Sequence, residues 1–290
     1  MPVQRSLLAK YTPLLGLLLL LHRPCFADAG IDYPPVAAEV DFETVLSLPV
    51  AKPDSLQSYG TAPGQFAELW LPASTAEPVP VVAFIHGGCW LNAYSIDHSH
   101  ALATGLAQAG YAVWNIEYRR VGDAGGGWPG SFEDVQAALA LLLQQRDPRL
   151  DLQRLLLAGH SAGGHLALLA AANADPRSDT AYRAVFGLAA IVDIVEYAGG
   201  TGSCNAATPR FMGGMPAQRP EHYRAANPEA KTIPGPVYLL RGSRDRIVPL
   251  RPVALPVHTQ VDMEAGHFDW ITPGSPAWNV FLEQLAAASR

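Results

Sequence analysis

Short apolar runs alternate along this chain with longer segments whose apolar positions recur at helical spacing. Runs of the first kind are typical of buried strands, and segments of the second kind are typical of amphipathic helices. We expect strands at 65–71, 81–85, 111–117, 155–158, 185–192, 237–240 and 259–263. We expect helices at 99–109, 131–145 and 277–288, and an Ala- and Leu-rich helix after the 155–158 strand. This alternation predicts an α/β fold with a mostly parallel, doubly wound sheet and helices on both faces.

Residues at the ends of these elements add detail. The 65–71 segment alternates apolar and polar residues, so we expect an antiparallel strand at the edge of the sheet. Gly110 follows the 99–109 helix as a C-terminal cap, and Ser131 is placed to cap the 131–145 helix.

The N-terminal segment differs from the rest of the chain. Basic residues at Arg5 and Lys10 precede an apolar run that is shorter than a membrane-spanning helix. Small residues before Asp28 fit a signal-peptidase site, so we expect a signal peptide at 1–27 and a secreted or periplasmic protein. An N-terminal membrane anchor that is not cleaved is the alternative. Residues 28–64 are Pro-rich and are predicted to form an irregular segment packed on a single domain at 65–290.

A G-x-S-x-G pattern, formed by Gly159, Ser161 and Gly163, lies between a strand-like run and a helix-like segment. In that setting the pattern predicts a nucleophile elbow, with Ser161 Oγ above the carboxyl end of the sheet. Glycines on both sides let the strand and the helix approach closely. The alternative is a glycine-rich turn in which the serine only caps the helix.

The sequence HGGCW at 86–90 ends another expected strand. Glycines at a strand exit bring backbone N–H groups close to a ligand. We therefore expect the amides of Gly87 and Gly88, together with that of Ala162 after the candidate nucleophile, to form an oxyanion hole. We expect His86 to orient this loop by hydrogen bonding rather than to shuttle a proton.

A serine hydroxyl becomes a nucleophile when an imidazole removes its proton and a carboxylate fixes the imidazole tautomer. Asp245, in the polar turn after the 237–240 strand, and His267, which follows a glycine, supply these groups. Asp193, after the 185–192 run, is the alternative acid. The histidines show no spacing typical of a zinc site, so we expect no metal and no cofactor.

With these motifs the chain resembles the α/β-hydrolase superfamily. The HGG-x-W loop, the GHSAGGHLA elbow and the GHFD loop are similar to those of the esterase and arylformamidase (kynurenine formamidase) group, over roughly residues 66–281. The resemblance implies a catalytic triad of Ser161, Asp245 and His267, in the chain order that this fold imposes. It also implies that the HGG residues contribute to the oxyanion hole.

The chain departs from the superfamily between Asp245 and His267, where the segment is short. Pro252 and Pro256 fall inside it, so we expect an abbreviated helix and an altered pocket wall. Residues 117–120, Glu-Tyr-Arg-Arg, either grip a polar substrate group or form a structural ion pair, and we favour the ion pair. Four side chains from long loops are candidates to line an aromatic or acyl pocket, with ordinary packing as the alternative: Trp90, Tyr94, Trp128 and Met212.

Two cysteines, Cys89 and Cys204, remain when Cys25 leaves with the signal peptide. Both fall in loops expected at the carboxyl edge of the sheet, and export places them in an oxidising compartment. We expect a disulfide that stiffens the oxyanion loop. Two free thiols are the alternative.

Composition limits the partners. The chain is 49% hydrophobic and 16% charged, with a net charge of −6, which fits a globular enzyme and disfavours nucleic acid or an anionic membrane as partner. We expect a small-molecule ester as substrate, no membrane contact beyond the export signal, and leave the oligomeric state open. The resemblance implies a serine hydrolase that cleaves carboxylic esters through an acyl-enzyme.

Three alternatives to this function remain. Two are other reactions, and the third is a protein without catalytic activity. An arylformamidase acting on N-formylkynurenine would use the same residues, although export disfavours it. An acyltransferase would differ only in the acceptor. A non-catalytic binding module on a hydrolase scaffold is disfavoured because all three triad residues are present.

Overall fold

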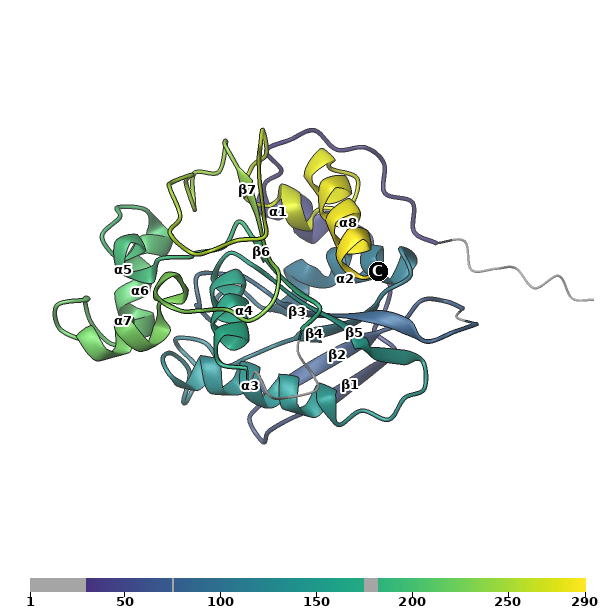
Figure 1. Cartoon of the computed structure of the whole chain (residues 1–290), viewed down its shortest axis with the longest axis horizontal. Coiled ribbons are helices and arrows are strands. Elements are labelled where there is room, and N and C mark those ends of the chain that lie inside the picture. The colour runs from purple at the N-terminus through teal and green to yellow at the C-terminus, as the bar shows by residue number, and fades with distance from the viewer. Residues whose placement is uncertain (1–29, 75, 175–181) are drawn as a thin grey trace, which may run out of the picture.

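The computed structural model of the protein describes residues 30–74, 76–174 and 182–290 (Figure 1). In this part of the chain eight strands form one sheet, in the order β1-β2-β4-β3-β5-β6-β7-β8. The strands are β1 (Ser55–Ser58), β2 (Phe66–Trp70), β3 (Val79–Ile85), β4 (Ala112–Ile116), β5 (Leu150–His160), β6 (Ala184–Leu188), β7 (Val237–Gly242) and β8 (Thr259–Met263). Strand β2 pairs antiparallel with β1 and β4, and the other pairings are parallel, which confirms the predicted sheet.

Helices connect and cover these strands (Figure 1). The α-helices are α1 (Phe42–Ser47), α2 (His100–Gln108), α3 (Gly130–Leu143), α4 (Ala162–Ala172), α5 (Ile194–Tyr197), α6 (Ser203–Met212), α7 (Pro220–Ala226) and α8 (Pro276–Ala288). Short 3-10 turns lie at η1 (Ile96–Ser99), η2 (Pro228–Ala230) and η3 (Asp269–Ile271). No helix within the described residues is long and apolar enough to cross a membrane.

The sheet separates two hydrophobic cores. In β3, Val81, Ala83 and Ile85 point into one core, and Val82 and Phe84 point into the other. This follows from the two-residue period of a strand, and it explains why β3 is an unbroken apolar run. Helices α3 and α4 complete the first core, and α1, α2 and α8 complete the second, so helices cover both faces as predicted.

The N-terminal segment is more regular than expected. Residues predicted to be irregular include helix α1, which Asp41 caps by accepting a hydrogen bond from the amide of Thr44. They also include β1, which pairs with β2. Strand β2 is therefore antiparallel, as expected, but it does not form the edge of the sheet.

Of two predicted helix caps, the one at Gly110 is confirmed and the one at Ser131 is wrong. Helix α2 ends just before Gly110, whose φ of 93° favours glycine, as the sequence predicts. Helix α3 begins at Gly130, so Ser131 is not its N-cap. The Ser131 hydroxyl donates instead to the carbonyl of Arg119, at 2.6 Å, and accepts from the amide of Gly127.

The connections after β6 and β7 shape the carboxyl edge of the sheet. Strand β6 ends at Leu188, earlier than expected, because Ala189 has a φ of 46° and turns the chain. The long connection at 196–234 contains α6 and α7. The fully described segment at 243–258 contains no helix, so the expected shortening is complete.

Candidate active site

Ser161 lies in the sharp turn between β5 and α4, at the carboxyl edge of the sheet. Its φ of 55° is in the left-handed region that serine rarely adopts, which is the strain expected of a nucleophile elbow. A Cβ on Gly159 would overlap the carbonyl oxygen of Gly163, and a Cβ on Gly163 would overlap that of Ile85. Only glycine therefore lets β3, β5 and α4 pack this closely around Ser161.

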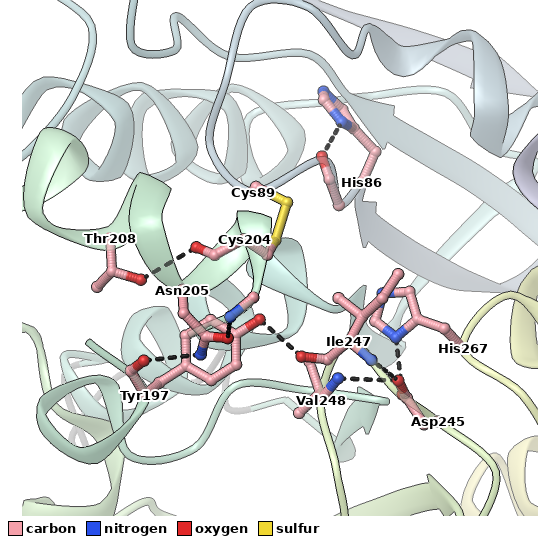
Figure 2. The surroundings of a disulfide bond; sticks show 12 residues. His86, Cys89, Tyr197, Cys204, Asn205, Thr208, Asp245, Ile247, Val248 and His267 are labelled. Carbon is pink, nitrogen blue, oxygen red and sulfur yellow. Dashed lines mark hydrogen bonds and ion pairs between the residues drawn. A yellow bond between two sulfur atoms is a disulfide. The ribbon is translucent and has the colours of Figure 1, made fainter. Parts of the chain in front are cut away.

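Asp245 and His267 are paired (Figure 2), and His267 lies against His160, the residue before Ser161. The Nδ1 atom of His267 lies 2.7 Å from Oδ2 of Asp245, and both residues are buried. The amides of Ile247 and Val248 each donate to Oδ1 of Asp245 at 2.8 Å, which fixes the carboxylate. Because an ionised carboxylate accepts the Nδ1 proton, the lone pair of His267 is on Nε2, where a general base needs it.

The backbone of the candidate base His267 is also held by a hydrogen bond. His160 Nε2 lies 2.9 Å from the carbonyl oxygen of His267 and donates to it. Burial, and then the proximity of His267, lower the pKa of His160 well below its usual value, so this ring is neutral. Within the described residues Ser161 Oγ has no hydrogen-bond partner, and in ligand-free enzymes the nucleophile–base bond often forms only when substrate binds.

The HGG loop (residues 86–90) lies against the candidate nucleophile. A Cβ on Gly87 would lie 3.1 Å from Cβ of Ser161, and Gly88 has a φ of 100°. The amides of Gly87, Gly88 and Ala162 make no hydrogen bond within the described part of the chain. Gly87 and Ala162 thus hold N–H groups next to Ser161 that no described residue accepts, and Gly88 holds a third one position further along the loop, as an oxyanion hole requires.

A disulfide joins the HGG loop to helix α6 (Figure 2). Cys89 and Cys204 have Cα atoms 5.2 Å apart, and Cys204 lies in the first turn of α6 rather than in a loop. The bond therefore attaches the loop that carries the candidate oxyanion donors to the long connection after β6.

The expected pocket residues divide into two groups. Trp90 and Met212 are fully buried core residues, and Trp90 stacks on Phe211 with ring centroids 4.7 Å apart. The expectation that these two line a pocket is wrong. Tyr94 and Trp128 are half-buried. Tyr94 lies against Gly88 of the HGG loop, whereas Trp128 stacks on Phe132 with ring centroids 5.7 Å apart.

Sequence reasoning missed an aromatic wall formed by Phe42, Tyr94 and Phe268. Phe42, from helix α1, lies 5.4 Å from Tyr94 and 5.6 Å from Phe268, measured between ring centroids. Phe268 in turn packs edge-on against the candidate base His267 at 5.0 Å. The sequence feature that could have predicted helix α1 is Asp41, a helix-capping residue before a short apolar segment. The proline content of this region favoured an irregular structure instead.

A cavity of about 500 Å³ lies between the connection after β6 and the loop that carries Asp245. Its wall includes Ile191, Tyr197, Arg246 and Val248. The Tyr197 hydroxyl donates to the carbonyl of Ile247 at 2.8 Å, which ties α5 to the turn of the candidate acid. Burial, and the charge of Asp245, raise the pKa of Tyr197.

The alternative carboxylates have structural roles. Asp193 caps α5 by accepting from the amides of Val195 and Glu196, and it does not contact His267. Asp269 is fully buried and accepts from the amides of Glu39, Val40 and Gly266. Among the described residues no three His, Cys, Asp or Glu side chains are grouped to bind a metal ion.

The sheet order and the strained serine turn define the class of this protein, which is that of the α/β-hydrolases. Residues 67–255, well over half of the chain, match the BD-FAE family. The protein belongs to that family.

Similar proteins agree with this class. The chain is 30% identical to esterase LipC of Mycobacterium tuberculosis over 216 residues, which are 66% of this chain and 51% of LipC. It is 34% identical to kynurenine formamidase of Danio rerio over 111 residues, 38% of this chain and 36% of that protein. The chain thus spans about half, or less, of these relatives. Esterase B of Lactobacillus rhamnosis shares the fold with a TM-score of 0.69 at 20% identity, over 86% of this chain and 90% of that structure.

Proposed function

We propose that this α/β-hydrolase is a serine esterase that cleaves carboxylic esters through an acyl-enzyme. The observation that carries the proposal is the bond of 2.7 Å between His267 and Asp245, beside a serine held in a strained strand–helix turn. The similarity to esterase LipC supports the ester as substrate class.

In the first half of the reaction Ser161 Oγ forms a bond to the ester carbonyl carbon while His267 Nε2 takes its proton. The oxyanion accepts hydrogen bonds from the amides of Gly87, Gly88 and Ala162. The bond to the alcohol oxygen then breaks, and His267 returns the proton to the departing alcohol. Asp245 stabilises the histidine while it is charged.

In the second half a water molecule attacks the acyl-serine and His267 takes a proton from it. The bond between the acyl carbon and Ser161 Oγ breaks, and the proton returns to the serine, which releases the carboxylic acid. The aromatic wall, which packs against His267 through Phe268, supports substrates with a small acyl or aryl group.

Arylformamidase activity is the second candidate, because a stretch of the chain is similar to a kynurenine formamidase. The same groups would cleave the C–N bond of a formamide, with an amine as leaving group. The two activities share Ser161, and they differ in the leaving group that the pocket accepts.

Paired measurements of kcat/KM on p-nitrophenyl butyrate and N-formylkynurenine test both activities. The Ser161→Ala variant is expected to lower turnover on the preferred substrate by about 10⁴–10⁶-fold, because it removes the nucleophile. A fluorophosphonate probe that labels the native protein and not this variant would identify the serine. Unchanged turnover in a clean preparation of the variant would contradict the proposal.

We also propose that the protein is exported, because residues 1–27 contain basic residues followed by an apolar run, which fits a signal peptide. That segment lies outside the described residues. Cell fractionation followed by N-terminal sequencing of the mature protein is expected to find a chain that begins at Asp28. An intact N-terminus in the membrane fraction would instead support an anchor.

A further inference from the structure

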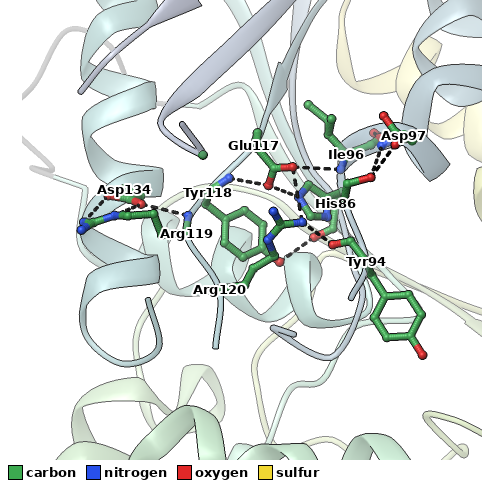
Figure 3. Close-up of polar contacts among 12 residues, drawn as sticks. His86, Tyr94, Ile96, Asp97, Glu117, Tyr118, Arg119, Arg120 and Asp134 are labelled. Atoms are coloured by element: carbon green, nitrogen blue, oxygen red, sulfur yellow. Dashed lines mark hydrogen bonds and ion pairs between the residues drawn. The ribbon is translucent and has the colours of Figure 1, made fainter. Parts of the chain in front are cut away.

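Behind the HGG loop, both ring nitrogens of His86 face hydrogen-bond acceptors (Figure 3). Its Nε2 lies 2.8 Å from Oε1 of Glu117, and its Nδ1 lies 2.9 Å from the carbonyl oxygen of Gly87. The ring is fully buried, so no water competes for either position. A carbonyl oxygen only accepts, which means that Nδ1 carries a proton.

The state of Glu117 decides the other nitrogen. Its carboxylate accepts from the amides of Tyr118, at 2.8 Å, and Ile96, at 3.0 Å, and it lies 3.4 Å from the guanidinium of Arg120. Burial alone would raise the pKa of Glu117, but His86, Arg120 and the amide of Tyr118 outweigh it and lower the pKa. Two amide donors and a guanidinium around this carboxyl group stabilise its ionised form, so Glu117 has no proton to give and Nε2 of His86 donates to it.

We propose that His86 donates from both ring nitrogens, and that this imidazolium positions and polarises the candidate oxyanion hole through the peptide between Gly87 and Gly88. The charged ring donates to the Gly87 carbonyl, and the N–H of that same peptide unit belongs to Gly88. Polarising the carbonyl end of a peptide strengthens its N–H as a donor, by roughly 10–30% per bond in a hydrogen-bonded chain. His86 and Glu117 are thus positioning residues that act through Gly88.

Groups on every side of His86 are compatible with this charge. The ring of Tyr118 stacks on it with centroids 4.6 Å apart, a cation–π contact, and the Tyr118 hydroxyl donates to the carbonyl of His86. His98 packs edge-on at 5.4 Å, and burial lowers its pKa to about 3, so it is neutral. The second cation, Arg120, lies 3.7 Å from a further carboxylate, Asp123. Two cations therefore face two carboxylates.

The charge of His86 is measured directly by ¹⁵N NMR of the full protein labelled at histidine. We expect His86 to show two protonated ring nitrogens in the folded protein at pH 7. In Glu117→Gln we expect one of these protons to be lost. A neutral His86 in the native protein at pH 7 would overturn the proposal. Because this measurement uses the native protein, it does not depend on whether a variant folds.

The effect on the oxyanion hole rests on the proposed esterase function and is tested by kinetics. For Glu117→Gln we expect kcat to fall roughly tenfold with KM nearly unchanged, because a donor is weakened rather than lost. Affinity for a trifluoromethyl ketone, which forms an oxyanion on Ser161, should fall by a similar factor. A merely structural role would not move these two quantities together while sparing KM.

Glu68→Gln is the matched control. Glu68 is also buried and lies 3.1 Å from a histidine, His100, outside the HGG loop. We expect this variant to keep the native kcat and ketone affinity. Equal losses in both variants, or no loss in Glu117→Gln, would overturn the proposal. If the native protein hydrolyses no ester, the proposed function fails, and the NMR result still decides the charge of His86.

Discussion

The candidate active site contains two buried histidine–carboxylate pairs. They differ in what surrounds the second ring nitrogen of the histidine. His267 and Asp245 are 2.7 Å apart, and His86 and Glu117 are 2.8 Å apart. The second ring nitrogen of His267 has no partner among the described residues, whereas that of His86 faces a carbonyl oxygen. The number of acceptors around the ring therefore decides whether a histidine moves a proton or keeps it.

Asp245→Asn tests the first pair and has the largest expected effect. The amide would donate to Nδ1 of His267 and move the ring proton to Nε2, so the histidine could no longer act as base. We expect kcat to fall by about 10⁴-fold with the fold intact. Steady-state kinetics and a thermal unfolding curve check this, with Glu117→Gln as the same change at the second pair. A loss below tenfold would mean that Asp245 does not orient the base.

Removing the disulfide tests how much it stabilises the HGG loop, which lies between the two histidine–carboxylate pairs. We expect Cys204→Ser to lower the free energy of unfolding by roughly 2–4 kcal/mol, because the bond closes a long loop. Urea unfolding with and without a reductant measures the change. The reductant should destabilise the native protein and leave the variant unaffected. Equal unfolding midpoints for the reduced and oxidised native protein would contradict this prediction.

Neutral buried histidines give a smaller effect that depends on pH. Burial lowers the pKa of His165 to about 4 and that of His98 to about 3. Because these pKa values are lower in the folded than in the unfolded protein, the unfolded chain binds more protons as the pH falls below about 6.5. We expect each histidine to lower the free energy of unfolding by about 2 kcal/mol between pH 7 and pH 5.

Urea unfolding at both pH values checks this expectation, and His165→Leu is the control. The leucine variant should show a shallower dependence on pH than the native protein. An identical slope would mean that His165 is already charged in the folded state.

The parts of the site that the sequence predicted depend on local pattern. Gly159, Ser161 and Gly163 are neighbours along the chain, and the turn they form follows from their own conformational preferences. The alternation of apolar runs likewise predicted the order and type of most strands. The bond between Asp245 and His267 could be anticipated because both follow parallel strands that end at one edge of the sheet.

The parts that the sequence did not predict depend on chain direction and distant contacts. Positive φ angles at Gly88, Cys89 and Trp90 turn the chain inward, so Trp90 enters the core although it follows a surface loop. Phe42 reaches the site because a short helix docks next to a loop more than two hundred residues away. Hydrophobic periodicity carries no information on either event.

The contacts of Asp269 link the two ends of the chain in time as well as in space. This residue lies two positions after the candidate base and binds the amides of Glu39 and Val40. Because those partners are synthesised first and Asp269 almost last, the loop that carries His267 reaches its final shape only when nearly the whole chain is available. A chain still emerging from the ribosome would carry the elbow serine without its candidate base, so the proposed activity would begin only when synthesis is nearly complete.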